Sequence, residues 1–330
     1  MNDKLVKDIC QILSPTGSED AVRAFIENEI KDYVDEYFTD PIGNLIAHKK
    51  GDGPKMMLAG HMDQIGLLVS HVDENGFIKF ATMGGFSEYI LFNQRVIFAN
   101  GTVGVVRSER VENMKSDYSM EKLYIDIGAK DKADAEKKVK VGDVCGYLND
   151  TYIDENIIIS PSLDDRIGCY VMIEALKQIK NPVYDLYFVF TVQEEIGLRG
   201  AHASGYTVNP DYAIAYDVTS ACDTPNALKL PMKMGDGAAI KIKDSSLICA
   251  PEVVNFMEKV AKEHNIKHQF EILTRGGTDS GAIQLARGGV KAGVVSIVTR
   301  YIHSDNEMCS VADVDACVAL TVKMLETKIS

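Results

Sequence analysis

Two adjacent glutamates, Glu194 and Glu195, are the residues whose placement most clearly suggests chemistry. They follow an apolar, β-branched and aromatic run that begins at Tyr184 and is typical of a buried strand in a parallel sheet. Two neighbouring carboxylates at the end of such a strand repel each other unless a positive charge lies beside them. A metal ion would supply that charge, with one glutamate as its ligand and the other handling protons. The alternative is a solvated acidic turn, which an isolated pair of glutamates would favour.

Other acids and histidines follow predicted strands in the same way. They are His61 and Asp63 after the strand at 55–59, Asp164 and Asp165 at a helix start, Asp217 at a strand end, and His303. Singly, an aspartate at a strand end is more often a turn former or a helix cap than a ligand. Together these residues would converge, because ligands bind at the carboxyl ends of the strands of an open α/β sheet. Such a set suits two divalent ions (zinc, cobalt or manganese) about 3.5–4 Å apart with a shared carboxylate and water.

The candidate ligands lie in two segments with an alternating helix–strand pattern. The predicted helices cover residues 3–12, about 18–31, 166–179, 251–265, 279–287 and 311–327, and the predicted strands 55–59, 184–192, 212–216, 270–273 and 290–298. Residues 197–205 are predicted to form a glycine-rich turn and residues 109–120 a flexible loop. Between the two segments, short alternating runs separated by turn residues predict a small all-β unit. The expected fold class is therefore α/β, a sheet containing mostly parallel strands between helices, with an inserted β-barrel-like domain.

Composition excludes several other classes of protein. A chain of 330 residues is long enough for two domains. The formal net charge of −13 argues against a nucleic-acid partner and against an acidic membrane surface. No apolar run approaches the roughly 18–20 residues of a membrane span, and the N-terminus lacks a secretory apolar segment. Seven scattered cysteines without a CxxC pair indicate reduced thiols rather than disulfides, and hence a cytoplasmic protein.

The motifs also resemble those of a known family. GHMDQIG, SLDDRIG, VQEEIGLRGA, YDVT, RGGTDSGAIQ and TRYIHS, in this order, are similar to those of the M42 family of dinuclear metalloaminopeptidases. The resemblance covers essentially the whole chain. It implies a catalytic metallopeptidase domain over residues 1–69 and 159–330, and an inserted β domain over 70–158. In the family this insertion mediates dimerisation and helps to build a dodecameric tetrahedral shell, so a homo-oligomer is expected.

The resemblance also implies roles for the candidate residues. Asp164 would bridge two metal ions, His61 and Asp217 would lie at different ions, and Glu195 and His303 would each join one. Glu194 would be the general base that takes a proton from a bridging water, and Asp63 would support His61. The substrates would be peptides with a free N-terminus. One departure is that Phe86-Ser87-Glu88 stands where relatives usually carry a Trp-Asp pair, and another is Asn93 in place of a glycine.

Several alternatives stay open at this stage. A glycoside hydrolase, as some family members are labelled, would need two carboxyls about 5–9.5 Å apart across the sugar bond. A deacylase or carboxypeptidase could use the same ions, and a degenerate chain could serve assembly alone. The pair His264 and His268 is expected to be a solvated helix end, and the loop 275–281 to contact substrate rather than phosphate. The preferred N-terminal residue and the native metal do not follow from the sequence.

Overall fold

The computed structural model describes residues 1–112 and 118–329 and contains one large mixed sheet and one closed barrel. The sheet has the order β1-β2-β12-β3-β13-β16-β17-β11-β10, and β14, which pairs with β15, joins it beside β16. Its strands are β1 (Glu36–Thr39), β2 (Leu45–Lys49), β3 (Lys55–His61), β10 (Tyr152–Ile153), β11 (Ile157–Ser160), β12 (Asp185–Thr191), β13 (Tyr212–Ser220), β14 (Ala238–Lys243), β15 (His268–Ile272), β16 (Lys291–Arg300) and β17 (Glu307–Ser310). The four central strands β12, β3, β13 and β16 are parallel, and antiparallel strands flank them.

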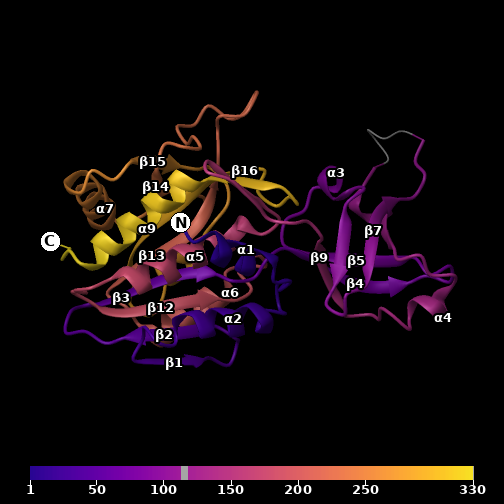
Figure 1. The fold of residues 1–330 in the computed structure, drawn as a ribbon, viewed down its shortest axis with the longest axis horizontal. Helices are drawn as coiled ribbons and strands as arrows, with labels where there is room; N and C mark the ends of the chain where they lie inside the picture. The colour runs from indigo at the N-terminus through magenta and orange to yellow at the C-terminus, as the bar shows by residue number, and fades with distance from the viewer. Residues whose placement is uncertain (113–117, 330) are drawn as a thin grey trace.

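Helices cover both faces of this sheet (Figure 1). One face packs against α1 (Asp3–Gln11), α2 (Asp20–Ile30), α5 (Leu163–Gln178), α7 (Pro251–Glu263) and α9 (Val311–Leu325), and the other against α6 (Arg199–Val208) and α8 (Asp279–Ile283). Alternate residues of β3 pack on opposite faces of the sheet. Leu58 belongs to the hydrophobic core on the first face and Met57 to the core on the second. Because both faces of the central strands are buried, these strands are continuously apolar, as the sequence predicts.

The β unit forms a separate lobe (Figure 1). Its strands close in the order β4-β5-β8-β7-β6-β9 around a small core of their own. The strands are β4 (Gly66–Val72), β5 (Ile78–Met83), β6 (Arg95–Phe98), β7 (Val103–Ser108), β8 (Leu123–Asp126) and β9 (Val144–Tyr147), with the short helices α3 (Glu88–Leu91), η1 (Met120–Lys122) and α4 (Lys132–Ala135). The expected domain limits of 70 and 158 therefore fall inside β4, which belongs to the barrel, and β11, which belongs to the large sheet.

Two sequence-based expectations about local structure need correction. The segment predicted as a glycine-rich turn at 197–205 is mostly helix α6. Its glycines serve close packing: a Cβ on Gly200 would lie 2.3 Å from Asn44 Oδ1, and one on Gly205 would lie 3.4 Å from Ile283 in α8. The helix predicted over 279–287 ends at Ile283. Part of the loop predicted over 109–120 lies outside the described residues.

Candidate metal centre

The register of the parallel strands brings the ligand candidates to one edge of the sheet. Thr191 at the end of β12 pairs with His61 at the end of β3, so Glu194 and Glu195 emerge beside the histidine. On the other side of β3, the pairing with β13 stops at Ala215, two residues before Asp217. Asp217 therefore lies inside β13 rather than at its end, but beyond the part that β3 covers.

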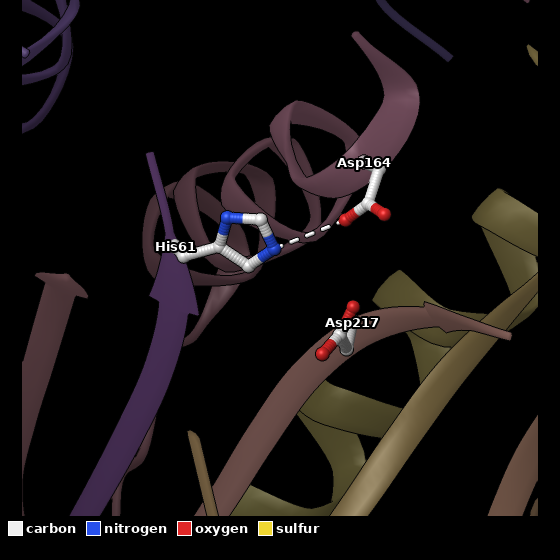
Figure 2. Close-up of side chains that lie close together, drawn as sticks. All are labelled: His61, Asp164 and Asp217. Carbon is white, nitrogen blue, oxygen red and sulfur yellow. Dashed lines mark hydrogen bonds and ion pairs between the residues drawn. The ribbon is translucent and has the colours of Figure 1, made fainter. Parts of the chain in front are cut away.

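Asp164 lies between two histidines. It stands at the start of α5, where the helical geometry is interrupted, and the Asp164–Asp165 peptide bond is cis. Its Oδ1 lies 3.0 Å from His61 Nε2, and its Oδ2 lies 3.2 Å from His303 Nε2. Figure 2 shows the first contact, with Asp217 facing the same space from β13. Each oxygen of one carboxylate thus faces a different histidine, which is the arrangement that a ligand shared by two ions requires.

The other donors complete two overlapping clusters. In each cluster, possible ligand atoms of three residues lie within 4.8 Å of one another: His61, Asp164 and Asp217 in one, and Asp164, Glu195 and His303 in the other. Glu195 Oε2 lies 3.2 Å from His303 Nε2. The family resemblance placed His61 and Asp217 at different ions, whereas the structure groups them together and groups Glu195 with His303.

Glu194 forms a third such group with His61 and Glu195. Its Oε2 lies 4.0 Å from His61 Nε2, farther than the Asp164 oxygen. It therefore borders both clusters without filling either. This position suits a residue that exchanges protons beside bound ions.

The electrostatics of the site reflect crowded, buried carboxylates. Burial raises the pKa of Glu194, Glu195 and Asp217, and neighbouring carboxylates raise it further. Burial alone would lower the pKa of His303, but contacts with Asp164 and Glu195 raise it to about 12. Without bound cations, a cluster of this composition therefore balances its charge by binding protons on its carboxyls and histidines. Divalent cations would take the place of those protons.

The donor set fits such cations. Imidazole nitrogens and carboxylate oxygens are the ligands that zinc, cobalt and manganese accept. Within the described residues, Glu195 Oε1 is buried and has no hydrogen-bond partner. An unpaired buried carboxylate oxygen is costly, and a bound cation would remove that cost.

Asp63 was expected to support His61, and in the structure its carboxylate also binds the backbone of the two glutamates. The contact of 3.2 Å to His61 Nδ1 comes from the Asp63 backbone carbonyl, while the carboxylate Oδ1 lies 3.6 Å away. The carboxylate accepts hydrogen bonds from the backbone N–H of Glu194 at 3.1 Å and of Glu195 at 3.4 Å, and from the Thr16 hydroxyl at 2.8 Å. Asp63 therefore holds the backbone of the two glutamates.

The barrel reaches the centre through one glycine pair. A Cβ on Gly84 would lie 3.0 Å from Glu195 Oε2, and one on Gly85 would lie 3.1 Å from His303 Nδ1. Gly84 also has a φ of +90°, a left-handed conformation that favours glycine. The loop after β5 thus needs glycine because its backbone lies against two of the candidate ligands.

A cavity of about 390 Å³ opens onto these groups. Its lining also includes Gly276 and Gly277, from the loop 275–281 expected to contact substrate, together with Leu273 and Lys241. Lys241 is 1% exposed, and its Nζ lies 2.6 Å from Glu271 Oε1 and 3.1 Å from Asp244 Oδ2. The sequence analysis did not identify this triad. The sequence carries no local signal for this triad, because the pairing of Lys241 with Glu271 depends on the register between β14 and β15.

The other histidine candidates take no part in the centre. His264 caps the end of α7 and is exposed, and His268 Nδ1 contacts the carbonyl of Ile266 at 3.0 Å. Neither residue lines the cavity. Within the part of the chain that the structure describes, no helix is long and apolar enough to cross a membrane.

Comparison with known proteins gives a consistent result. A protein of Acetivibrio thermocellus, named as a candidate aminopeptidase, is 46% identical over 322 residues, which cover 97% of either chain. A solved aminopeptidase from Desulfurococcus kamchatkensis superposes with a TM-score of 0.95 at 35% identity, covering 99% of this chain and 94% of that chain. The TET1 peptidase of Pyrococcus horikoshii, described as assembling into a tetrahedron or a large octahedral shell, superposes with a TM-score of 0.89 at 30% identity, covering 98% of each chain. The family model for M42 glutamyl aminopeptidase matches residues 43–320, and the chain therefore belongs to this family.

Proposed function

We propose that this chain is a metal-dependent aminopeptidase that removes N-terminal residues from peptides. The observation that carries the proposal is Asp164, whose two oxygens face His61 and His303 at 3.0 and 3.2 Å. In this proposal His61, Asp164 and Asp217 hold one divalent ion, and Asp164, Glu195 and His303 hold the other. The aminopeptidase names of the relatives support the choice of reaction.

When bound, the two ions supply Lewis acidity toward the scissile carbonyl and toward the attacking water. The chain supplies the proton transfers. Glu194 borders both clusters, and burial raises the pKa of its carboxyl above the ordinary value of a glutamate, which is the direction expected of a proton-transferring acid. Glu194 takes the proton of the water as it attacks and then gives that proton to the leaving amine.

The cavity holds the residue to be removed. The carboxylates of the centre line it together with Lys241 and Gly277. The aminopeptidase names of the relatives favour substrates with a free N-terminal amine. We therefore expect peptides with an unblocked N-terminus to be cleaved and N-acetylated peptides to be left intact.

The decisive test uses aminoacyl-p-nitroanilides as substrates for the purified, metal-loaded chain. Glu194→Gln should lower kcat by about 10²–10⁴-fold, because the amide cannot accept the proton, while the metal content stays unchanged. A matched control is Glu74→Gln, because Glu74 is an exposed barrel residue whose side chain is 85% accessible. Wild-type turnover in the Glu194→Gln chain would refute the role of this residue. Activity on an N-acylated substrate or on a cellulose oligomer, in place of the aminoacyl substrates, would refute the proposed reaction.

We also propose that the barrel lobe serves assembly, first into dimers and then into a dodecamer. The shells described for the TET1 peptidase support this proposal, since the chains match over 98% of their lengths. We also propose a cytoplasmic location, because the cysteines of the described residues are free thiols and a reducing compartment keeps thiols free. Light scattering of the metal-loaded chain tests the assembly, and a monomer would contradict it.

A further inference from the structure

Glu307 is a buried carboxylate that none of the proposed catalytic steps uses. It is 1% exposed and begins β17, which lies between β16 and β11 in the sheet. The chain leaving β16 leads to His303, and the chain leaving β11 leads to Asp164. Glu307 therefore lies between the two segments that carry these candidate ligands.

The carboxylate of Glu307 binds both segments through their backbone. Its Oε1 accepts a hydrogen bond of 2.7 Å from the His303 N–H, and its Oε2 accepts one of 2.9 Å from the Asp164 N–H. Each oxygen thus serves a different ligand residue. The bond from Asp164 is buried and the bond from His303 is partly buried, so water competes little for the two N–H groups and the bridge restrains both segments.

The backbone at His303 needs such support. Its φ is +63°, in the left-handed region that is unfavourable for a residue with a side chain, and Tyr301 two residues earlier has a φ of +61°. The turn is also exposed at Tyr301, which is 54% accessible, so packing alone restrains it weakly. The ligands of the other cluster are held differently, because His61 and Asp217 lie within the central strands β3 and β13.

We propose that Glu307 is a positioning residue that fixes His303 relative to Asp164 and thereby sets the affinity of the ion site formed with Glu195. This inference rests on the proposed two-metal function. The larger effect falls on the site formed with Glu195, because both residues that Glu307 binds are ligands there, whereas only Asp164 is a ligand at the other site. Outer residues that orient ligands commonly change metal affinity by about 10–100-fold.

The matched control is a second buried carboxylate with the same bonding pattern. Asp313 is 1% exposed and accepts backbone hydrogen bonds of 2.7 Å from both Gly235 and Gly237. It contacts no candidate ligand through these bonds. Asp313→Asn and Glu307→Gln each replace one acceptor oxygen by an NH2 group that can only donate, so both variants should lose stability for the same reason.

The experiment titrates metal-free protein with Zn²⁺ by calorimetry and measures the melting temperature alongside. The wild-type chain and Asp313→Asn should each bind two ions with similar Kd values. In Glu307→Gln the ion at Glu195 and His303 should bind at least tenfold more weakly, and the ion at His61 and Asp217 should be affected less. If Glu307→Gln does not fold, Glu307→Asp decides the question, because its side chain keeps the carboxyl group but is too short to reach both N–H groups.

Each result has a distinct meaning. Two ions bound by the Glu307 variant with wild-type Kd values would overturn the positioning role while leaving the proposed function intact. The same weaker binding in Asp313→Asn would also overturn it, since the effect would then follow from lower stability alone. A wild-type chain that binds one ion or none would overturn the proposed function and this inference with it. Cobalt substitution adds a spectroscopic signature, because the visible band of the Co²⁺ at Glu195 and His303 should be weakened or lost only in the Glu307 variants.

Discussion

Replacing Lys241 by methionine should destabilise the protein strongly, although the two side chains are similar in length. Lys241 lies within 2.6 Å of Glu271 Oε1 and 3.1 Å of Asp244 Oδ2, and the side chains of these acids are fully buried. Burial would lower the pKa of Lys241, but the two acids raise it, so the lysine stays charged. Lys241→Met leaves both carboxylates buried without a counter-charge. Removing one partner of a buried ion pair costs about 3–5 kcal/mol, and we expect an effect of this size.

Denaturation in guanidinium chloride, compared with an exposed pair, provides the assay. Lys132 and Glu74 are 3.2 Å apart with accessible side chains, so Lys132→Met should cost at most about 1 kcal/mol. Adding Glu271→Gln to the Lys241→Met chain should recover part of the loss, because one uncompensated charge disappears. Equal midpoints for Lys241→Met and Lys132→Met would refute the reasoning. So would further destabilisation by Glu271→Gln in the double variant.

Two further predictions concern individual hydrogen bonds. Asp63→Asn should lower kcat by about 10–100-fold, because it loosens the backbone of Glu194 and Glu195. Steady-state kinetics, combined with metal analysis, would measure this loss. An unchanged kcat would contradict the prediction. Arg300 binds Asp223 at 2.9 and 2.7 Å and holds the pKa of that carboxyl below its usual range. The stabilisation is therefore present above the usual pKa of an aspartate and is lost as the pH falls through the lowered pKa. The difference in melting temperature between wild type and Asp223→Asn should therefore shrink from about pH 6 to about pH 3, and a constant difference would count against it.

Much of the fold was predictable because burial determines the composition of the central strands. The apolar run before Glu194 forms β12, and KMMLA forms the start of β3. The turn predicted at 197–205 failed for a tertiary reason, since the glycines of α6 allow close packing against Asn44 and α8 rather than marking a turn. Periodicity and turn chemistry are local signals, and they do not report contacts with distant elements.

The candidate site divides in the same way. The residues proposed as metal ligands were identified by type and by their place after predicted strands, and the structure brings all of them to one edge of the sheet. Their division into two clusters depends on the register between strands, which the sequence does not contain. Lys241 was missed because its partner Glu271 is far away in the sequence, and Glu307 because its role lies in backbone hydrogen bonds.

The central claim, that one carboxylate joins two metal ions, is best tested by crystallography of the zinc-loaded protein with anomalous scattering at the zinc edge. We predict two peaks about 3.5–4 Å apart on either side of Asp164. One should lie beside His61 and Asp217, and the other beside Glu195 and His303. A single peak, or peaks away from Asp164, would contradict the account.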